Sequence, residues 1–128
     1  MVQLITQGIK VSIVTRFEGA YYEDIKTQYA FSYTITIENQ SEHTVQLASR
    51  YWEIRDSLNA VEVVEGDGVI GVQPTLKSGE KHTYSSGCLL QSPFGSMQGY
   101  YRMINFSTNS LFKVAIPNFK LNAPFAVN

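Results

Sequence analysis

A glycine-rich segment carries the most recognisable chemical motif in the chain. Residues 65–74 read EGDGVIGVQP, and the three glycines make a literal G-x-G-x-x-G, the pattern that binds pyrophosphate in dinucleotide-binding enzymes. That chemistry requires a helix directly after the motif, because the phosphates lie at the helix N-terminus. Pro74 prevents such a helix, and residues 87–91, where a ribose-binding acid is expected, contain no Asp or Glu. We therefore expect a turn or bulged connection in which the glycines adopt positive φ.

A smaller anion-binding role for the same segment stays open. Consecutive backbone N–H groups in a glycine-rich loop can form a nest for phosphate or pyrophosphate without a dinucleotide fold. A nearby arginine would supply the balancing positive charge. The candidate binding residues are Gly66, Asp67, Gly68, Gly71 and Arg102.

Metal ligands and nucleophiles form no motif. The two histidines, His43 and His82, are far apart in the sequence, and a single cysteine, Cys88, excludes an intramolecular disulfide and a cysteine-based zinc site. His82 and Ser86 would share a strand face, but about 13 Å apart, which is too far for a nucleophile and its base. We predict no metal site, no cofactor, no catalytic residue and no enzymatic activity. A site formed by His82, Cys88 and a carboxylate in the folded chain is the alternative.

Adjacent aromatic residues are candidates for a partner surface. In pairs such as Tyr51-Trp52 and Tyr100-Tyr101, a strand would direct one ring inward and the other outward. Surface tyrosine and tryptophan are typical interface anchors, although packing on a sheet face is an equally good explanation. The neighbouring arginines would stack on these rings, bind an anion or form surface ion pairs. The candidate partner residues are Tyr51, Trp52, Tyr100, Tyr101 and Phe94.

Period-two alternation predicts the elements that position these residues. In residues 29–37, YAFSYTITI, nearly every second side chain is large and apolar, as a half-buried antiparallel strand requires. The apolar parity changes near Ala48, which predicts a bulge, and we expect Pro117 to end the last strand. Residues 119–125 would pair with a sheet edge in the same molecule or in a second copy, making a homodimer. The predicted strands are residues 11–17, 29–37, 45–54, 61–65, 81–86, 97–105 and 111–116.

These patterns predict an all-β fold. Seven or eight short antiparallel strands favour an immunoglobulin- or fibronectin type III-like β-sandwich, with a barrel as the alternative. The 128 residues are the usual size of one domain. A net charge of −1 argues against a strongly basic nucleic-acid-binding face. The sequence contains no signal peptide and no apolar run of roughly 20 residues, so we expect a cytoplasmic protein without membrane contact.

Longer motifs resemble one family. Residues 65–103, EGDGVIGVQPTLKSGEKHTYSSGCLLQSPFGSMQGYYRM, together with LASRYW at 47–52 and FKVAIPNF at 112–119, are similar to the ApaG family. The resemblance covers essentially the whole chain and implies a single ApaG domain over residues 1–128. It implies a fibronectin type III-like sandwich without established enzymatic activity, linked in bacteria to cobalt resistance and magnesium efflux. Related domains in a eukaryotic F-box protein and in a polymerase-delta-interacting protein imply an adaptor role.

Two functions of different classes follow. The first is a binding module for an unidentified protein partner, using the loops at residues 66–74 and 87–97. The second is a small-anion sensor using the glycine segment with Arg102 or Lys77. Direct binding of Co²⁺ or Mg²⁺ is a third possibility.

Overall fold

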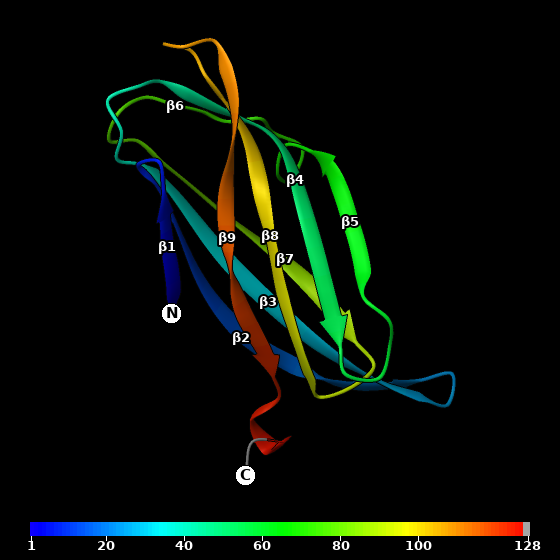
Figure 1. The fold of residues 1–128 in the computed structure, drawn as a ribbon. Coiled ribbons are helices and arrows are strands. Elements are labelled where there is room, and N and C mark those ends of the chain that lie inside the picture. The colour runs from blue at the N-terminus through cyan, green and yellow to red at the C-terminus, as the bar shows by residue number, and fades with distance from the viewer. Residues whose placement is uncertain (127–128) are drawn as a thin grey trace.

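Residues 1–126 are described by the computed structural model and form nine strands in two antiparallel sheets (Figure 1). The first sheet has the order β1-β2-β3-β7. The second has the order β5-β4-β8-β9, with β6 paired to β4. The predicted β-sandwich is confirmed, and two strands outside the predicted set, β1 and the two-residue β6, bring the number to nine. The elements are β1 (Val2–Thr6), β2 (Ile9–Glu23), β3 (Lys26–Asn39), β4 (Val45–Asp56), β5 (Glu62–Asp67), β6 (Thr75–Leu76), β7 (Lys81–Leu90), β8 (Phe94–Asn105), β9 (Ser110–Asn122) and a 3₁₀ turn, η1 (Pro124–Ala126).

The core lies between the two sheets and is filled by the inward member of each alternating pair. In β3, Phe31, Tyr33, Ile35 and Ile37 are buried, while the intervening hydroxyl side chains face outward. Fully burying a large apolar side chain stabilises the fold by roughly 1.5–3 kcal/mol. The matching core residues of the other long strands are Ile9, Val11 and Ile13 of β2, Val45, Leu47 and Trp52 of β4, Tyr101 and Met103 of β8, and Val114 and Ile116 of β9.

Bulges in β4 and β9 set which of their side chains face the core. The β4–β8 register shifts between Leu47 and Ser49, so the bulge predicted near Ala48 is confirmed. The prediction that Pro117 ends the last strand is wrong, because β9 continues to Asn122. Two residues, Pro117 and Asn118, lie opposite the single residue between Met97 and Gly99. Proline is tolerated there because a bulge leaves a residue out of the hydrogen-bond ladder.

The two sides of the sandwich differ. On one side β1 lies against β9, where the amide of Ala115 donates to Thr6 Oγ1 at 3.3 Å. The segment beginning at Phe119 pairs with β8 of its own chain up to Asn122, and pairing with a second copy stays a prediction. On the other side, β5 and β7 are the free edges of their sheets among the described strands.

The β2–β3 hairpin extends beyond the sandwich (Figure 1). Its turn residues Asp24 and Ile25 both adopt positive φ. Tyr21 and Tyr22 near this tip are both exposed, so the division into one inward and one outward ring, expected for each adjacent aromatic pair, is wrong for this one. Within residues 1–126, no helix is long and apolar enough to cross a membrane.

Candidate functional site

The glycine segment folds as the end of a strand followed by a tight turn. Gly68 and Gly71 have φ of +61° and +75°, as expected for glycines in a connection. Ile70 and Gly71 form the turn, and Val69 and Val72 exchange backbone hydrogen bonds of 2.8 and 3.1 Å across it. Gly66 differs from the expectation: it lies inside β5 opposite Arg50 and is not among the residues with positive φ.

Two amides of the glycine segment are already hydrogen-bonded within the fold. Gly68 N–H donates to the carbonyl of Ala48 at 2.9 Å, and Val69 N–H donates to Val72. Two carbonyl groups of the segment accept hydrogen bonds from Arg50 Nη1, at 3.0 Å for Asp67 and 2.8 Å for Gly68. At Asp67 and Gly68 the segment therefore presents carbonyl oxygens to an arginine. Anion binding by the segment stays a prediction.

Arg102 does not join this segment. Arg102 and Asp67 both lie opposite Ser49, from the two neighbours of β4, and are therefore two strand spacings, about 10 Å, apart. Arg102 instead donates to the hydroxyl of Tyr100 at 3.2 Å. The arginine that contacts the glycine segment is Arg50, whose partners are backbone carbonyls and therefore carry no sequence signal.

The aromatic pairs divide between the core and the outside. Trp52 and Tyr101 are 3% and 0% exposed, which corrects their assignment to a partner surface: they pack inside the sandwich. Tyr51 and Tyr100 lie on the opposite face of the same sheet, where their rings stack with centroids 4.9 Å apart and planes at 14°. Phe94 is 43% exposed and begins β8 on this same face, about 20 Å along the strand from Tyr100.

We call this surface the outer face: the side of β5, β4, β8 and β9 that points away from the core. The Tyr51–Tyr100 stack lies near its centre. Lys113 Nζ is 4.4 Å from the Tyr100 ring centroid and Arg102 Cζ is 5.4 Å from it, both within cation–π range. The two tyrosine rings are thus held by stacking on each other, and the Tyr100 ring also by two cations.

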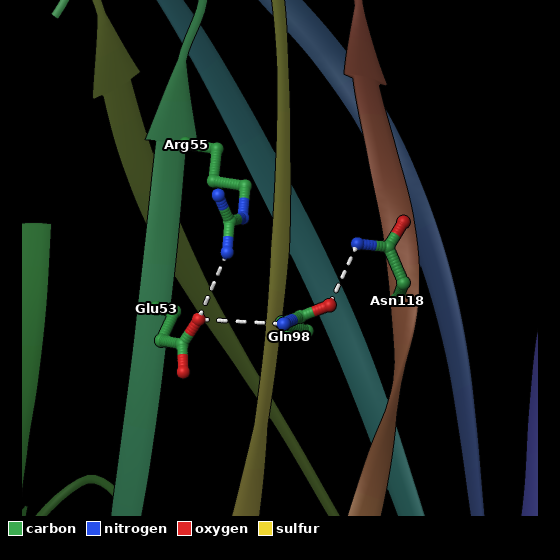
Figure 2. Close-up of polar contacts among 4 residues, drawn as sticks. All are labelled: Glu53, Arg55, Gln98 and Asn118. Atoms are coloured by element: carbon green, nitrogen blue, oxygen red, sulfur yellow. Dashed lines mark hydrogen bonds and ion pairs between the residues drawn. The ribbon is translucent and has the colours of Figure 1, made fainter. Parts of the chain in front are cut away.

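A row of polar contacts crosses the outer face next to the tyrosines (Figure 2). Glu53 Oε2 accepts from Arg55 Nη2 and from Gln98 Nε2, each at 3.3 Å. Gln98 Oε1 in turn accepts from Asn118 Nδ2 at 3.2 Å. These contacts link β4, β8 and β9, but the ion pair is exposed enough that it contributes at most about 1 kcal/mol.

Charge is distributed unevenly across the outer face. The β5 edge carries Glu65 and Asp67, whereas β9 carries Lys113 and Lys120, all exposed. In antiparallel pairs, opposite residues share a face, so Glu65, Tyr51 and Tyr100 form one row across three strands. The stacked tyrosines therefore lie between an acidic and a basic margin.

The loops expected to form the functional surface are shorter than predicted. β7 continues through Gly87 to Leu90 and β8 begins at Phe94, so the loop expected over residues 87–97 is confined to residues 91–93. The strand predicted at residues 81–86 is therefore longer than expected. Its pairing with β3 continues past Gly87, which lies opposite Ser32.

The candidate metal ligands stay apart. His43 lies in the β3–β4 connection, while His82 and Cys88 lie on β7. In the part of the chain that the structure describes, no three or more His, Cys, Asp or Glu side chains gather closely enough to hold a metal ion. Burial, followed by the charges of Glu62 and Asp56, raises the pKa of the Cys88 thiol to about 11, so it is protonated at neutral pH.

Known proteins match this chain over nearly its full length. The model of the ApaG domain matches residues 20–105. A protein named Protein ApaG from Brucella anthropi is 45% identical over 124 residues, covering 97% of this chain and 95% of the relative. Another of the same name from Beijerinckia indica is 40% identical over 126 residues, covering 98% and 96%.

A solved structure matches the fold. The crystal structure of the putative ApaA protein from Bordetella pertussis superposes with a TM-score of 0.83 at 38% identity, covering 91% of this chain and 94% of that one. The family resemblance inferred from the sequence motifs is therefore confirmed. The chain belongs to the ApaG family.

Proposed function

We propose that the chain is a non-enzymatic protein-interaction module that docks its partner on the outer face. The observation that carries this proposal is the Tyr51–Tyr100 stack, an aromatic pair left half-exposed at the centre of a sheet face. Tyrosine and arginine are enriched among the residues that dominate interface energies. Lys113 and Arg102 restrain the Tyr100 ring, so less side-chain entropy is lost when a partner covers it.

The charges around the stack specify the partner's chemistry. An acidic group on the partner would meet Lys113 and Arg102, and a basic group would meet Glu65 and Asp67 at the opposite margin. Between them, an apolar or aromatic patch would cover the two tyrosine rings. Such a surface has little net charge but a defined polarity, which fixes the orientation of docking more than it adds affinity.

Affinity capture with matched variants tests this proposal. Wild-type chain, Tyr100→Ser and Tyr22→Ser would each capture proteins from a bacterial lysate, with quantitative mass spectrometry as the readout. Tyr22 is 73% exposed on the distant β2–β3 hairpin and is the control for losing a surface tyrosine. We expect a protein that Tyr100→Ser loses and Tyr22→Ser retains, with about 30-fold weaker affinity for Tyr100→Ser when the purified pair is titrated. Identical capture by wild type and Tyr100→Ser would refute the proposal.

We extend the proposal to the cation phenotypes that the family resemblance implies. The chain would influence cobalt resistance and magnesium efflux through its partner rather than by holding ions. A bacterial strain lacking its own family member, complemented with each variant, tests this. We expect Tyr22→Ser to restore cobalt resistance as wild type does and Tyr100→Ser to fail. Equal complementation by the two variants at equal protein levels would contradict this extension.

A further inference from the structure

A cleft opens between the two sheets on the side away from β1 and β9, and it is distinct from the outer face. Its volume is about 330 Å³, at the lower end of the range for small-molecule sites. Its walls come from β3, β4, β5, β7 and β8 and from the turn after β5. It therefore lies where the sandwich is least closed by backbone pairing.

A cation lines this cleft without a carboxylate partner. Arg50 points inward from β4, and in residues 1–126 no Asp or Glu oxygen forms a salt bridge with it. Within residues 1–126, Arg50 donates its hydrogen bonds from Nη1, to the carbonyls of Asp67 and Gly68. Nη2 and Nε remain as donors for a ligand, and an arginine with two free donors matches the geometry of a carboxylate.

Hydroxyl groups converge on the same wall. Tyr33 lies opposite Ser86 on the paired strand, and both line the cleft. Tyr33 is only 6% exposed. Burial is the main cause that raises the Tyr33 pKa, so its hydroxyl is a proton donor at neutral pH. Tyr84 also lines the cleft, with its hydroxyl bonded to that of Tyr101 at 2.5 Å.

The rest of the wall is apolar. Trp52, Ile54, Val64, Val69 and Met97 line it together with the exposed Ile70 of the glycine turn. Asp67 contributes its carbonyl group to Arg50, and its side chain belongs to the outer face with Ser49. A cleft with one cation, a few hydroxyls and a large apolar wall suits an anion of single charge with an apolar body better than a multiply charged phosphate.

We propose that this cleft binds a small organic carboxylate, with the carboxylate on Arg50 and an aromatic or branched aliphatic body against Trp52 and Val64. Tyr33 donates a further hydrogen bond to the carboxylate. The role of Arg50 is thus twofold. Nη1 holds the glycine turn through its carbonyls, and the other donors hold the ligand.

The single tryptophan of the chain reports on this site. Nitrogen-15-labelled full-length protein would be titrated with benzoate, phenylacetate and 3-methylbutanoate, following the indole N–H signal of Trp52 and the Nε–H signal of Arg50. We expect saturable shifts with a dissociation constant near 1 mM for the best carboxylate. Benzamide, the neutral counterpart of benzoate, should bind at least about 10-fold more weakly than benzoate, because it lacks the charge that Arg50 recognises.

Variants distinguish carboxylate binding in the cleft from unspecific binding elsewhere on the protein. Arg50→Lys keeps the charge but loses the two-donor geometry, and we expect about 10-fold weaker binding. Val64→Phe should weaken binding by a similar factor because the larger side chain fills the cleft while the charge of Arg50 is kept. Arg16→Lys, at an exposed position of β2 outside both sites, should leave carboxylate binding unchanged. Should Arg50→Lys not fold, Val64→Phe and the comparison with benzamide still decide the question.

Three results would overturn the proposal. The first is the absence of saturable shifts at Trp52 with any of the three carboxylates up to about 20 mM. The second is equal binding of benzoate and benzamide. The third is binding of phosphate or pyrophosphate at this site without binding of the carboxylates. Loss of protein partners in the Tyr100→Ser capture experiment concerns the opposite face, so either proposal can fail alone.

Discussion

The guanidinium of Arg50 lies against the α-carbon of Gly66 on the neighbouring strand. A Cβ built on Gly66 would lie 2.9 Å from Arg50 Nη2 and 3.0 Å from Cζ. Position 66 therefore requires a glycine because the guanidinium occupies the space of a side chain, and not because the backbone has a positive φ there. This contact joins β4 to the glycine segment, because the same guanidinium donates to the carbonyls of Asp67 and Gly68.

Gly66→Ala should consequently destabilise the protein through Arg50. The guanidinium is the flexible end of a long side chain, so it moves aside and gives up its hydrogen bonds to the two carbonyls. We expect the free energy of unfolding to fall by about 1–3 kcal/mol, measured by urea denaturation. The control is the same substitution in an Arg50→Ala background, where it should cost much less. An unchanged cost in that background would show that Arg50 does not mediate the effect.

Gly68 and Gly71 should respond very differently to alanine. At Gly68 a Cβ would overlap the carbonyl oxygen of Val72, whereas at Gly71 it would meet no atom within 4 Å. Both residues have positive φ, which costs an alanine about 1 kcal/mol. We expect Gly71→Ala to lose about 1 kcal/mol and Gly68→Ala about 3 kcal/mol or more, by thermal and urea unfolding. Similar losses at the two positions would contradict the arrangement of this turn.

The strands were predictable because their signal is local. The alternation in residues 29–37 reports directly which side chains of β3 are buried. Which of Tyr51 and Trp52 points into the core was not predictable in the same way. It depends on the bulge at Ala48, because the exact position of the bulge decides the face of every residue after it. Pro117 failed as a strand end for the same reason, since a bulge accommodates it.

The candidate sites were less predictable because they depend on backbone groups and on contacts between distant strands, which no residue type in the sequence marks. The role of Gly66 arises from the guanidinium across the strand pair, and the partners of Arg50 are backbone carbonyls. Neither contact leaves a motif in the sequence. The cleft is likewise formed by strands distant in sequence that leave one side of the sandwich less closed. The family motifs identified the fold correctly but did not locate this cleft.

The hydroxyl pair of Tyr84 and Tyr101 should be energetically coupled. Their oxygens are 2.5 Å apart, and Tyr101 is fully buried. Replacing either tyrosine by phenylalanine leaves the other hydroxyl without this partner, and we expect each single change to cost about 1–2 kcal/mol. The double variant should cost clearly less than the sum, because both polar groups are removed together. Additive costs in urea denaturation would show that the hydroxyls do not depend on each other.

Asp56 should make stability depend on acid pH. Burial opposes its ionisation, but hydrogen bonds from Ser92 Oγ at 2.6 Å, Gln91 N–H at 2.6 Å and Leu58 N–H at 3.3 Å outweigh this and lower the pKa of its carboxyl group. A lowered folded-state pKa gives a stabilisation that is present above the unfolded value, about 3.9, and is lost as pH falls through the folded value.

Asp56→Asn tests this dependence. Because the side chain is partly exposed, we expect a modest cost of about 1 kcal/mol at pH 7, shrinking towards zero near pH 2.5. Glu42→Gln is the matched control, since Glu42 is exposed and lies in the distant β3–β4 connection. Its cost should be small at both pH values. A cost for Asp56→Asn that is the same at both pH values would exclude the carboxylate charge as its source.

Cys88 should react slowly with thiol reagents. Its pKa is raised to about 11, chiefly by burial and then by the carboxylates of Glu62 and Asp56. At pH 8 the thiolate fraction is roughly 200-fold smaller than for an ordinary cysteine of pKa near 8.5. The greater nucleophilicity of a more basic thiolate restores about 10-fold of this. We therefore expect the folded protein to react with 5,5′-dithiobis(2-nitrobenzoate) roughly 20-fold more slowly than the denatured chain, whose thiol has an ordinary pKa.

The pH dependence of this reaction separates the thiol pKa from simple shielding. If protonation limits the rate, the rate constant should rise about tenfold per pH unit between pH 7 and 10, whereas shielding of an ordinary thiolate would level off above about pH 9. Glu62 lines the same surface depression as Cys88, and its charge helps to raise the thiol pKa. Glu62→Gln should therefore increase the reaction rate slightly, whereas Lys120→Gln, on the outer face, should leave the rate unchanged. A rate for the folded protein that matches the denatured chain at pH 8 would show that the Cys88 thiol is neither buried nor shifted.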